Sequence, residues 1–143
     1  MKINDVIHAK SQQAVVTISP DATVRELVAL LAEHNVGALV VSDDGERVSG
    51  IVSERDVVRH LGRSGAGVLQ EPVSTIMTVE VHTCSFGDEI EDLAGSMTER
   101  RIRHVPVIED GRLAAIVTIG DVVKHRISQL QDERDHLVGY INQ

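Results

Sequence analysis

Apolar and polar residues alternate with two different periods along the first part of the chain. Apolar side chains recur at helical spacing from Val24 to Asn35, after turn and cap residues at 19–23, which predicts an amphipathic helix. Two β-prone runs, 37–41 and 48–52, lie on either side of an Asp-Asp-Gly turn and predict a hairpin. A second helix is expected from Ser53 to about Leu61.

The same order of elements returns later in the chain. We predict a helix at 90–100, strands at 104–108 and 113–117, and a closing helix that starts at Thr118. Each copy therefore has the order helix, strand, strand, helix.

The two copies can be superposed in sequence. Residues 18–61 match residues 84–127 at an offset of about 65 positions, with one extra residue in the first hairpin turn. A unit this small cannot bury its own apolar face, so we expect the copies to pack around a pseudo-twofold axis, with ligand clefts between them. The predicted fold class is α/β (α+β), with two α-β-β-α half-domains. The predicted divisions are 1–66, 67–127 and a C-terminal helix at 128–143.

The segments outside the copies carry separate expectations. Gly62–Gly67 reads as a flexible loop between the copies. Apolar residues from Ile127 to Ile141 recur every three or four positions, interrupted by Arg134, which predicts an amphipathic helix. This helix either folds back on its own module or binds a partner.

Composition narrows the classes of function. The formal net charge is −8 and the only aromatic residues are Phe86 and Tyr140, which disfavours nucleic acid as a partner. We find no apolar run of membrane-spanning length and no secretory segment, so no membrane association and a cytoplasmic location are expected. Cys84 is the single cysteine, which rules out an intrachain disulfide.

A short motif occurs at the same place in both copies. Ser53 and Thr118 each stand at a predicted helix start, with Asp56 and Asp121 three residues later. One interpretation is a capping box, in which hydroxyl and carboxylate satisfy backbone N–H groups. The other is a ligand site, in which the helix N-terminus attracts a phosphate and the carboxylate accepts hydrogen bonds from a ribose diol. Spacing alone leaves both open.

The duplicated order of elements, with the segments Gly50–Arg59 and His104–Gly111, resembles the cystathionine-β-synthase (CBS) domain family. The resemblance covers nearly the whole chain and is greatest to small stand-alone bacterial proteins made of one tandem CBS pair, a Bateman module. It implies two clefts that bind adenosine nucleotides such as AMP, ADP, ATP, NAD or S-adenosylmethionine, and a homodimer.

The resemblance also implies roles for individual residues. Asp56 and Asp121 would hold ribose hydroxyls, and Ser53 and Thr118 would meet phosphate or ribose oxygens. The remaining residues that it assigns to nucleotide binding are Arg103 and His104 for phosphate, Val36 and Ala38 beside the base, and Thr17 and Thr83 at the matched starts of the copies.

The first copy departs from the family pattern. Gly37 and Ala38 stand where the second copy has the basic pair Arg103 and His104, so the two clefts should differ in phosphate affinity. In the second copy Ala115 replaces Gly50, and Gly120 precedes the acid, which bears on how closely a ligand approaches.

The sequence thus predicts a regulatory adenosine-nucleotide sensor that acts by a ligand-dependent conformational change, without enzymatic activity and without an obligatory cofactor. The main alternative is a structural dimerisation or partner-binding module with vestigial clefts. No metal site is expected, since His82 and Cys84 form only a weak pattern, although a redox or metal sensor centred on this pair is a further alternative.

Overall fold

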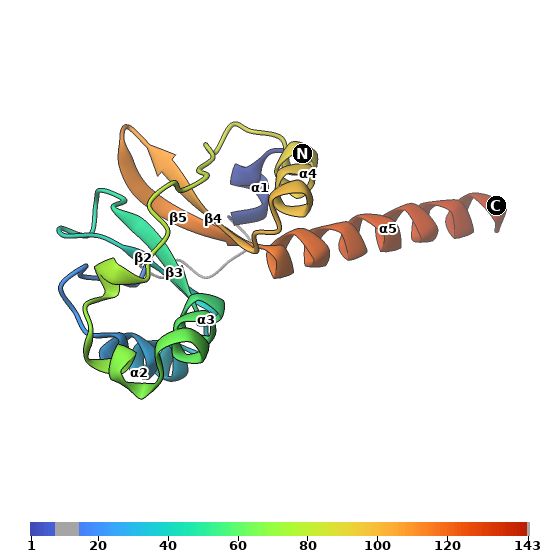
Figure 1. The fold of residues 1–143 in the computed structure, drawn as a ribbon. Coiled ribbons are helices and arrows are strands. Elements are labelled where there is room, and N and C mark those ends of the chain that lie inside the picture. The colour runs from blue at the N-terminus through green and yellow to red at the C-terminus, as the bar shows by residue number, and fades with distance from the viewer. Residues whose placement is uncertain (8–14, 143) are drawn as a thin grey trace.

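Each half of the chain folds into a β-hairpin that is preceded and followed by a helix, as the sequence predicts. The computed structural model describes residues 1–7 and 15–142 (Figure 1). The first half contains α2 (Val24–His34), β2 (Ala38–Val41), β3 (Gly50–Ser53) and α3 (Glu54–Ser64). The second half contains α4 (Ile90–Arg100), β4 (His104–Glu109), β5 (Arg112–Thr118) and α5 (Ile119–Ile141). The expected α+β fold is confirmed.

The two hairpins share a strand arrangement that the duplication explains. In the first half a short strand, β1 (Thr17–Ile18), pairs in parallel with β2 and sets Ile18 opposite Val41. In the second half Cys84 forms an isolated parallel bridge with Val107, at the matching position. Because β2 and β3 are antiparallel, the first half is a three-stranded mixed sheet. The second half is a two-stranded antiparallel sheet, β4 and β5, to which Cys84 adds its single parallel bridge.

Two separate hydrophobic clusters form the cores. The apolar face of α2 packs against the inward side chains of β2 and β3, and α4 packs in the same way against β4 and β5. The first cluster contains Ile18, Val24, Leu27, Leu31, Leu39, Val41, Val52, Val57, Val68, Val73 and Ile76. The second contains Ile3, Val6, Cys84, Ile90, Leu93, Met97, Val105, Val107 and Val117.

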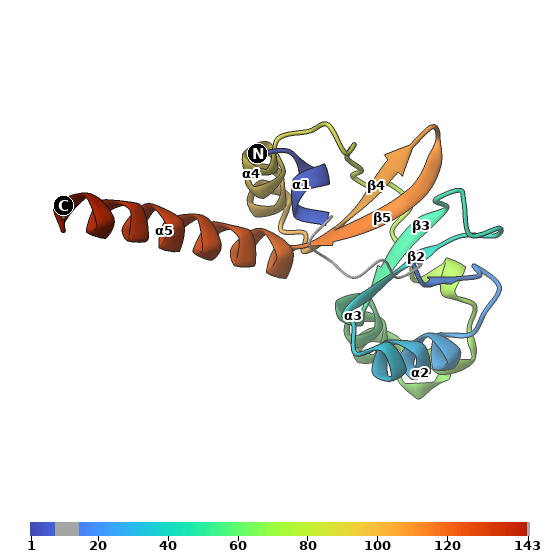
Figure 2. The ribbon, with the colours of Figure 1, turned by 180° about the vertical axis from the view of Figure 1, so that it is seen from behind.

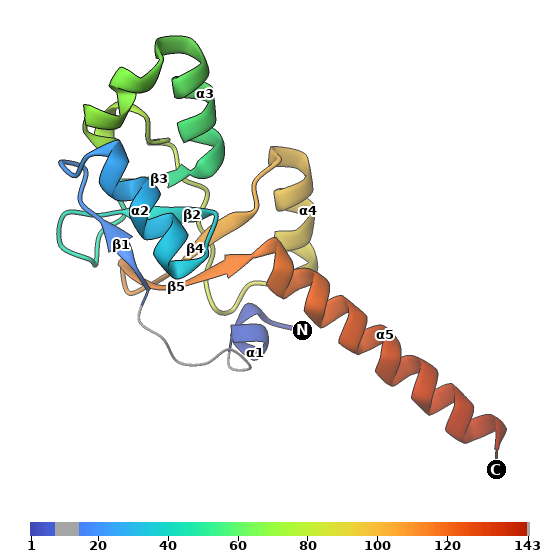
Figure 3. The same ribbon diagram turned by 90° about the horizontal axis from the view of Figure 1, so that it is seen from below.

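The second cluster includes residues from the start of the chain. The short helix α1 (Ile3–Ile7) lies beside α4 and the start of α5 (Figure 3), and Ile3 N donates to Asp88 O at 2.9 Å. The 3₁₀ turn η2 (Val73–Thr75) has the same place in the first half, where Val73 N donates to Ala22 O at 2.7 Å. Residues 1–7 are therefore the structural counterpart of residues 71–77. Because Ile3 and Val6 belong to the second cluster, side-chain packing crosses the predicted boundary at residue 66. The division of the chain into domains stays a prediction.

The ends of the two closing helices differ. The loop predicted at 62–67 is wrong in part, because α3 continues to Ser64, turns at Gly65 and leads into the 3₁₀ helix η1 (Ala66–Gln70). In the second half the closing helix and the predicted C-terminal helix are one element, α5, which extends away from the rest of the molecule (Figures 1 and 2).

Candidate functional site

The repeated motif forms a reciprocal cap at the start of α3 and of α5. In the first half Asp56 N donates to Ser53 Oγ at 3.3 Å, and Ser53 N donates to Asp56 Oδ2 at 2.9 Å. In the second half Asp121 N donates to Thr118 Oγ1 at 3.2 Å, and Thr118 N donates to Asp121 Oδ2 at 2.8 Å. The capping interpretation is therefore confirmed for both copies.

The cap does not use the whole carboxylate of Asp56. Its Oδ2 accepts from both the backbone N–H and the hydroxyl of Ser53, and no described residue donates a hydrogen bond to its Oδ1. The side chain is half-buried. A carboxylate held in one orientation with an acceptor oxygen left over is suited to a second donor, so the cap is compatible with the ligand interpretation.

Strand pairing places further predicted residues beside the caps. Ala38 is opposite Ser53 in the first hairpin, and His104 is opposite Thr118 in the second. Ala38 is buried and His104 half-buried. Because these registers are equivalent, each half has a capped helix start next to the first residue of its inner strand.

The two halves meet at these strand starts. A Cβ built on Gly37 would lie 3.5 Å from His104 Cε1 and 3.3 Å from Glu54 Oε1, so Gly37 is in near contact with the other half. Glu54 N donates to Gly37 O at 2.9 Å, and Ile119 N donates to Arg103 O at 2.8 Å. Since Gly37 and Arg103 are equivalent positions, the first turns of α3 and α5 lie at a common junction.

Other predicted residues border this junction less closely. Val36 is 40% exposed directly before β2, and Thr83 and Arg103 are exposed. Thr17 is half-buried in β1, where it pairs with Val40 rather than with a cap residue. From the sequence alone, no role was assigned to Glu54, whose carboxylate lies beside Gly37. Only the position of Glu54 inside the motif could have indicated it.

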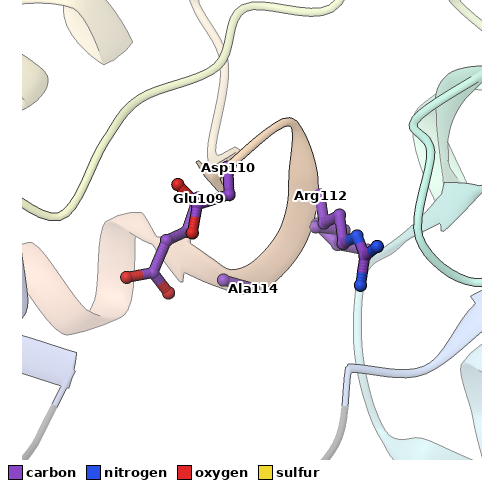
Figure 4. A pocket seen from close by; sticks show the side chains of 5 residues that line it. Glu109, Asp110, Arg112 and Ala114 are labelled. Atoms are coloured by element: carbon purple, nitrogen blue, oxygen red, sulfur yellow. The ribbon is translucent and has the colours of Figure 1, made fainter.

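Two hollows of the described surface lie away from this junction. One is lined by Glu109, Asp110, Arg112, Leu113 and Ala114 around the tip of the β4–β5 hairpin (Figure 4). There Arg112 extends toward the first hairpin, with its Nε 3.7 Å from Glu46 Oε2. The other runs along α5 beside Asp132, Glu133, His136 and Leu137. Neither is lined by a residue that the sequence assigned to nucleotide binding.

Cys84 has the properties of a core residue. Its side chain is buried, its Sγ donates to Pro106 O at 3.7 Å, and burial together with the nearby Asp88 raises the thiol pKa to about 11. A thiol that stays protonated at neutral pH is a poor metal ligand and a slow nucleophile. Within residues 1–7 and 15–142, no three His, Cys, Asp or Glu side chains converge on a metal position.

No helix in the described part of the chain is both long and apolar enough to cross a lipid bilayer.

Fold and junction together define a tandem α+β module, in which two equivalent halves present capped acidic helix starts to each other. The chain belongs to the CBS domain family, because the family model for the CBS domain matches residues 4–63 and again residues 73–128. The resemblance predicted from the sequence is confirmed.

Known proteins and solved structures are similar over most of their length. The mitochondrial CBS domain-containing protein CBSX3 of Arabidopsis thaliana is 36% identical over 97% of this chain and 71% of its own. The CBS domain-containing protein YhcV of Bacillus subtilis is 32% identical over 80% of each chain. The crystal structure of the CBS-domain containing protein ATU1752 of Agrobacterium tumefaciens superposes with a TM-score of 0.84 at 43% identity, covering 88% of this chain and 99% of that one.

A more distant neighbour was crystallised with ligands. The CBS domain pair of protein MJ0100, in complex with 5′-methylthioadenosine and S-adenosyl-L-methionine, superposes with a TM-score of 0.78 at 23% identity, over 90% of this chain and 98% of that one. At this identity the likeness concerns the fold.

Proposed function

We propose that this protein is a regulatory module that binds an adenosine nucleotide, of the AMP, ADP, ATP or NAD type, at the junction of its two halves. The observation that carries the proposal is the pair of carboxylates, Asp56 and Asp121, fixed at equivalent helix starts that meet at one junction. The adenosine ligands of the MJ0100 pair, which has the same fold, support the choice of ligand class.

The geometry suggests a division of roles. Asp56 and Asp121 would accept hydrogen bonds from ribose hydroxyls, while the N-terminal turns of α3 and α5 and the hydroxyls of Ser53 and Thr118 would face the ribose or phosphate. The adenine would lie against the backbone near Val36 and Ala38 and the matching residues of the second half. Thr17 and Thr83 are assigned to the edge of the site by resemblance only.

The two sites should be unequal. Near the second half, Arg103 supplies a guanidinium and the half-buried His104 an imidazole, both of which could form hydrogen bonds to phosphate. Near the first half, Gly37 and Ala38 supply none, and the Glu54 carboxylate adds repulsion toward an anion. We therefore propose that a phosphorylated ligand binds on the Arg103 side first.

The regulatory action would follow from the way the halves are joined. Besides the contact at Gly37, the hairpins meet where Leu113 N donates to Glu46 O at 2.7 Å and Arg112 approaches the Glu46 carboxylate. A ligand that contacts both helix starts would favour one relative arrangement by its difference in affinity. We propose that a regulated protein reads this change, that the module has no catalytic activity of its own, and that it acts in the cytoplasm as a homodimer.

The test is calorimetry with AMP, ATP and NAD, supported by thermal shift. A ligand at about a hundred times its dissociation constant should stabilise the fold by about 2.7 kcal/mol. We expect Asp56→Ala and Asp121→Ala each to abolish one binding event. Loss of a cap should also lower the free energy of unfolding by about 1 kcal/mol.

The helix α2 supplies a matched control. Its cap has the same reciprocal form, with Thr23 N donating to Glu26 Oε2 at 3.0 Å and Glu26 N donating to Thr23 Oγ1 at 3.1 Å. Glu26→Ala should lower stability by a similar amount and leave nucleotide binding unchanged. If Asp56→Ala and Asp121→Ala behave as Glu26→Ala does, the carboxylates are caps only, and the module is a structural one with vestigial clefts.

A further inference from the structure

The long helix α5 exposes a line of large apolar side chains. Val123, Ile127, Leu130, Leu137 and Ile141 have exposed fractions between 47% and 77%. Every described residue from Arg126 onward is exposed except Gln129, which is half-exposed. The helix has not folded back onto its own module, which favours the alternative in which it binds a partner.

A different face of α5 contacts the rest of the molecule. Val122 and His125 are half-buried on this face, where the first turns of the helix lie near α1 and α4, and Val122 packs against the second hydrophobic cluster. The exposed apolar line begins at the neighbouring Val123 and points elsewhere. Its residues are therefore not the edge of the existing core.

Comparison of the two halves explains why α5 continues outward. In the first half the chain turns back after α3, and η1 packs on α2 through contacts that include Leu30, Leu61 and Val68. At the positions of Leu30 and Leu61 the second half has Ser96 and Arg126, which are polar. A returning segment would bury nothing apolar there, so the straight course of the helix follows from its sequence.

The spacing along the exposed line is that of a coiled coil. Steps of four and three residues alternate through Val123, Ile127, Leu130, Arg134, Leu137 and Ile141. Helical segments of this length without packing are only marginally stable in water. A second helix laid along the line would supply the missing packing.

We propose that α5 pairs with α5 of a second copy of this chain, antiparallel. Arg134 determines the relative direction of the two helices. In a parallel pair the two Arg134 side chains would lie opposite each other in the seam, the line along which the two helices touch. In an antiparallel pair Arg134 instead lies opposite Leu130 of the other copy, and its guanidinium reaches the Glu133 carboxylates. Within the described part of the single chain, Arg134 forms an exposed ion pair with Asp135, at 3.1 Å.

The antiparallel arrangement also matches the exposed length of the helix. It sets Val123 opposite Ile141 and Ile127 opposite Leu137, so every seam residue has a seam partner. The overlap starts where α5 leaves α1 and α4, and the two bodies lie at opposite ends of the pair. It also keeps the basic residues Lys124 and Arg126 of one copy away from those of the other.

The first test measures association of the full chain by sedimentation equilibrium. We expect Ile127→Glu combined with Leu137→Glu to raise the dissociation constant of the dimer by about a hundredfold or more, because these two positions face each other in the antiparallel pair and each apolar contact would become a pair of like charges. The control is Ser128→Glu combined with His136→Glu, which adds two glutamates on the outer face of the same helix. The control should keep the wild-type association, and circular dichroism checks that both variants fold.

The second test determines direction by disulfide cross-linking in a Cys84→Ala background. We expect Val123→Cys and Ile141→Cys chains to form a mixed disulfide when combined, and neither to cross-link alone. Self-cross-linking of either chain, or absence of the mixed disulfide, overturns the antiparallel arrangement. If sedimentation equilibrium gives the double-glutamate seam variant the same association as the wild type, the pairing through α5 is wrong. This holds whether both proteins are monomers or both assemble through another face.

Discussion

The atoms around Gly50 leave no space for a side chain at this position. A Cβ at this position would lie 2.8 Å from both Met77 Sδ and Thr78 O, and that carbonyl already accepts from Ile51 N at 2.9 Å. Sequence comparison relates Gly50 and its counterpart Ala115 to ligand approach, whereas the structure gives a packing reason. The capping boxes were predictable, since hydroxyl and acid are three residues apart. The contact between Gly50 and Met77 was not, because it depends on how the linker returns.

Gly50→Ala should therefore lower the free energy of unfolding by about 1–3 kcal/mol, since the added methyl group meets backbone that is held by a hydrogen bond. Chemical denaturation measures the change. The matched control is Gly95→Ala in α4, where a Cβ meets nothing within 4 Å and the substitution should stabilise the helix by about 0.5–1 kcal/mol. Equal effects at both glycines would contradict this account.

At the scale of elements, long periodic segments were predicted well and short ones were not. The helix α4 has the predicted bounds, and the four hairpin strands lie within about two residues of their expected positions. The helix α1 was missed because five residues carry no periodic signal, and its partners are more than 80 positions away in the chain. The continuity of α5 was also missed, because the closing helix and the C-terminal helix were treated as separate patterns.

Ile3→Ala tests the contribution of α1. The Ile3 side chain is fully buried in the second cluster, so its truncation should lower the free energy of unfolding by about 2–5 kcal/mol. Val79→Ala, at a side chain that is 68% exposed, serves as the control and should change stability by less than about 0.5 kcal/mol. A cost for Ile3→Ala as small as that of the control would mean that α1 does not hold the second half together.

The whole molecule contains two hydrophobic cores that share no residue and are joined at the hairpins. The duplication in the sequence predicted two equivalent halves that pack against each other. The contacts at the junction, Gly37 with His104 and Glu46 with Leu113, were beyond sequence analysis, because they depend on the relative position of two independently folded surfaces. For the same reason, the sequence indicated that the two capped helix starts lie near each other, but not which residues connect them.

Because the hydrophobic clusters share no residue, damage to one should remain local. Amide hydrogen exchange of the Ile3→Ala variant should show lost protection in β4 and β5, with β2 and β3 retaining most of theirs. The reciprocal variant Val73→Ala should show the opposite pattern. Uniform loss of protection across both hairpins in either variant would indicate that the halves open as one unit.

The place of α1 has a consequence for synthesis. Residues 1–7 leave the ribosome before any other part described here, yet the pocket they fill is made of residues 84 to 122, which are translated much later. The first core is built from residues 16 to 77, which are all made earlier. It can therefore fold before the residues that bury 1–7 have been synthesised. Residues 1–7 are thus synthesised well before the core that buries them.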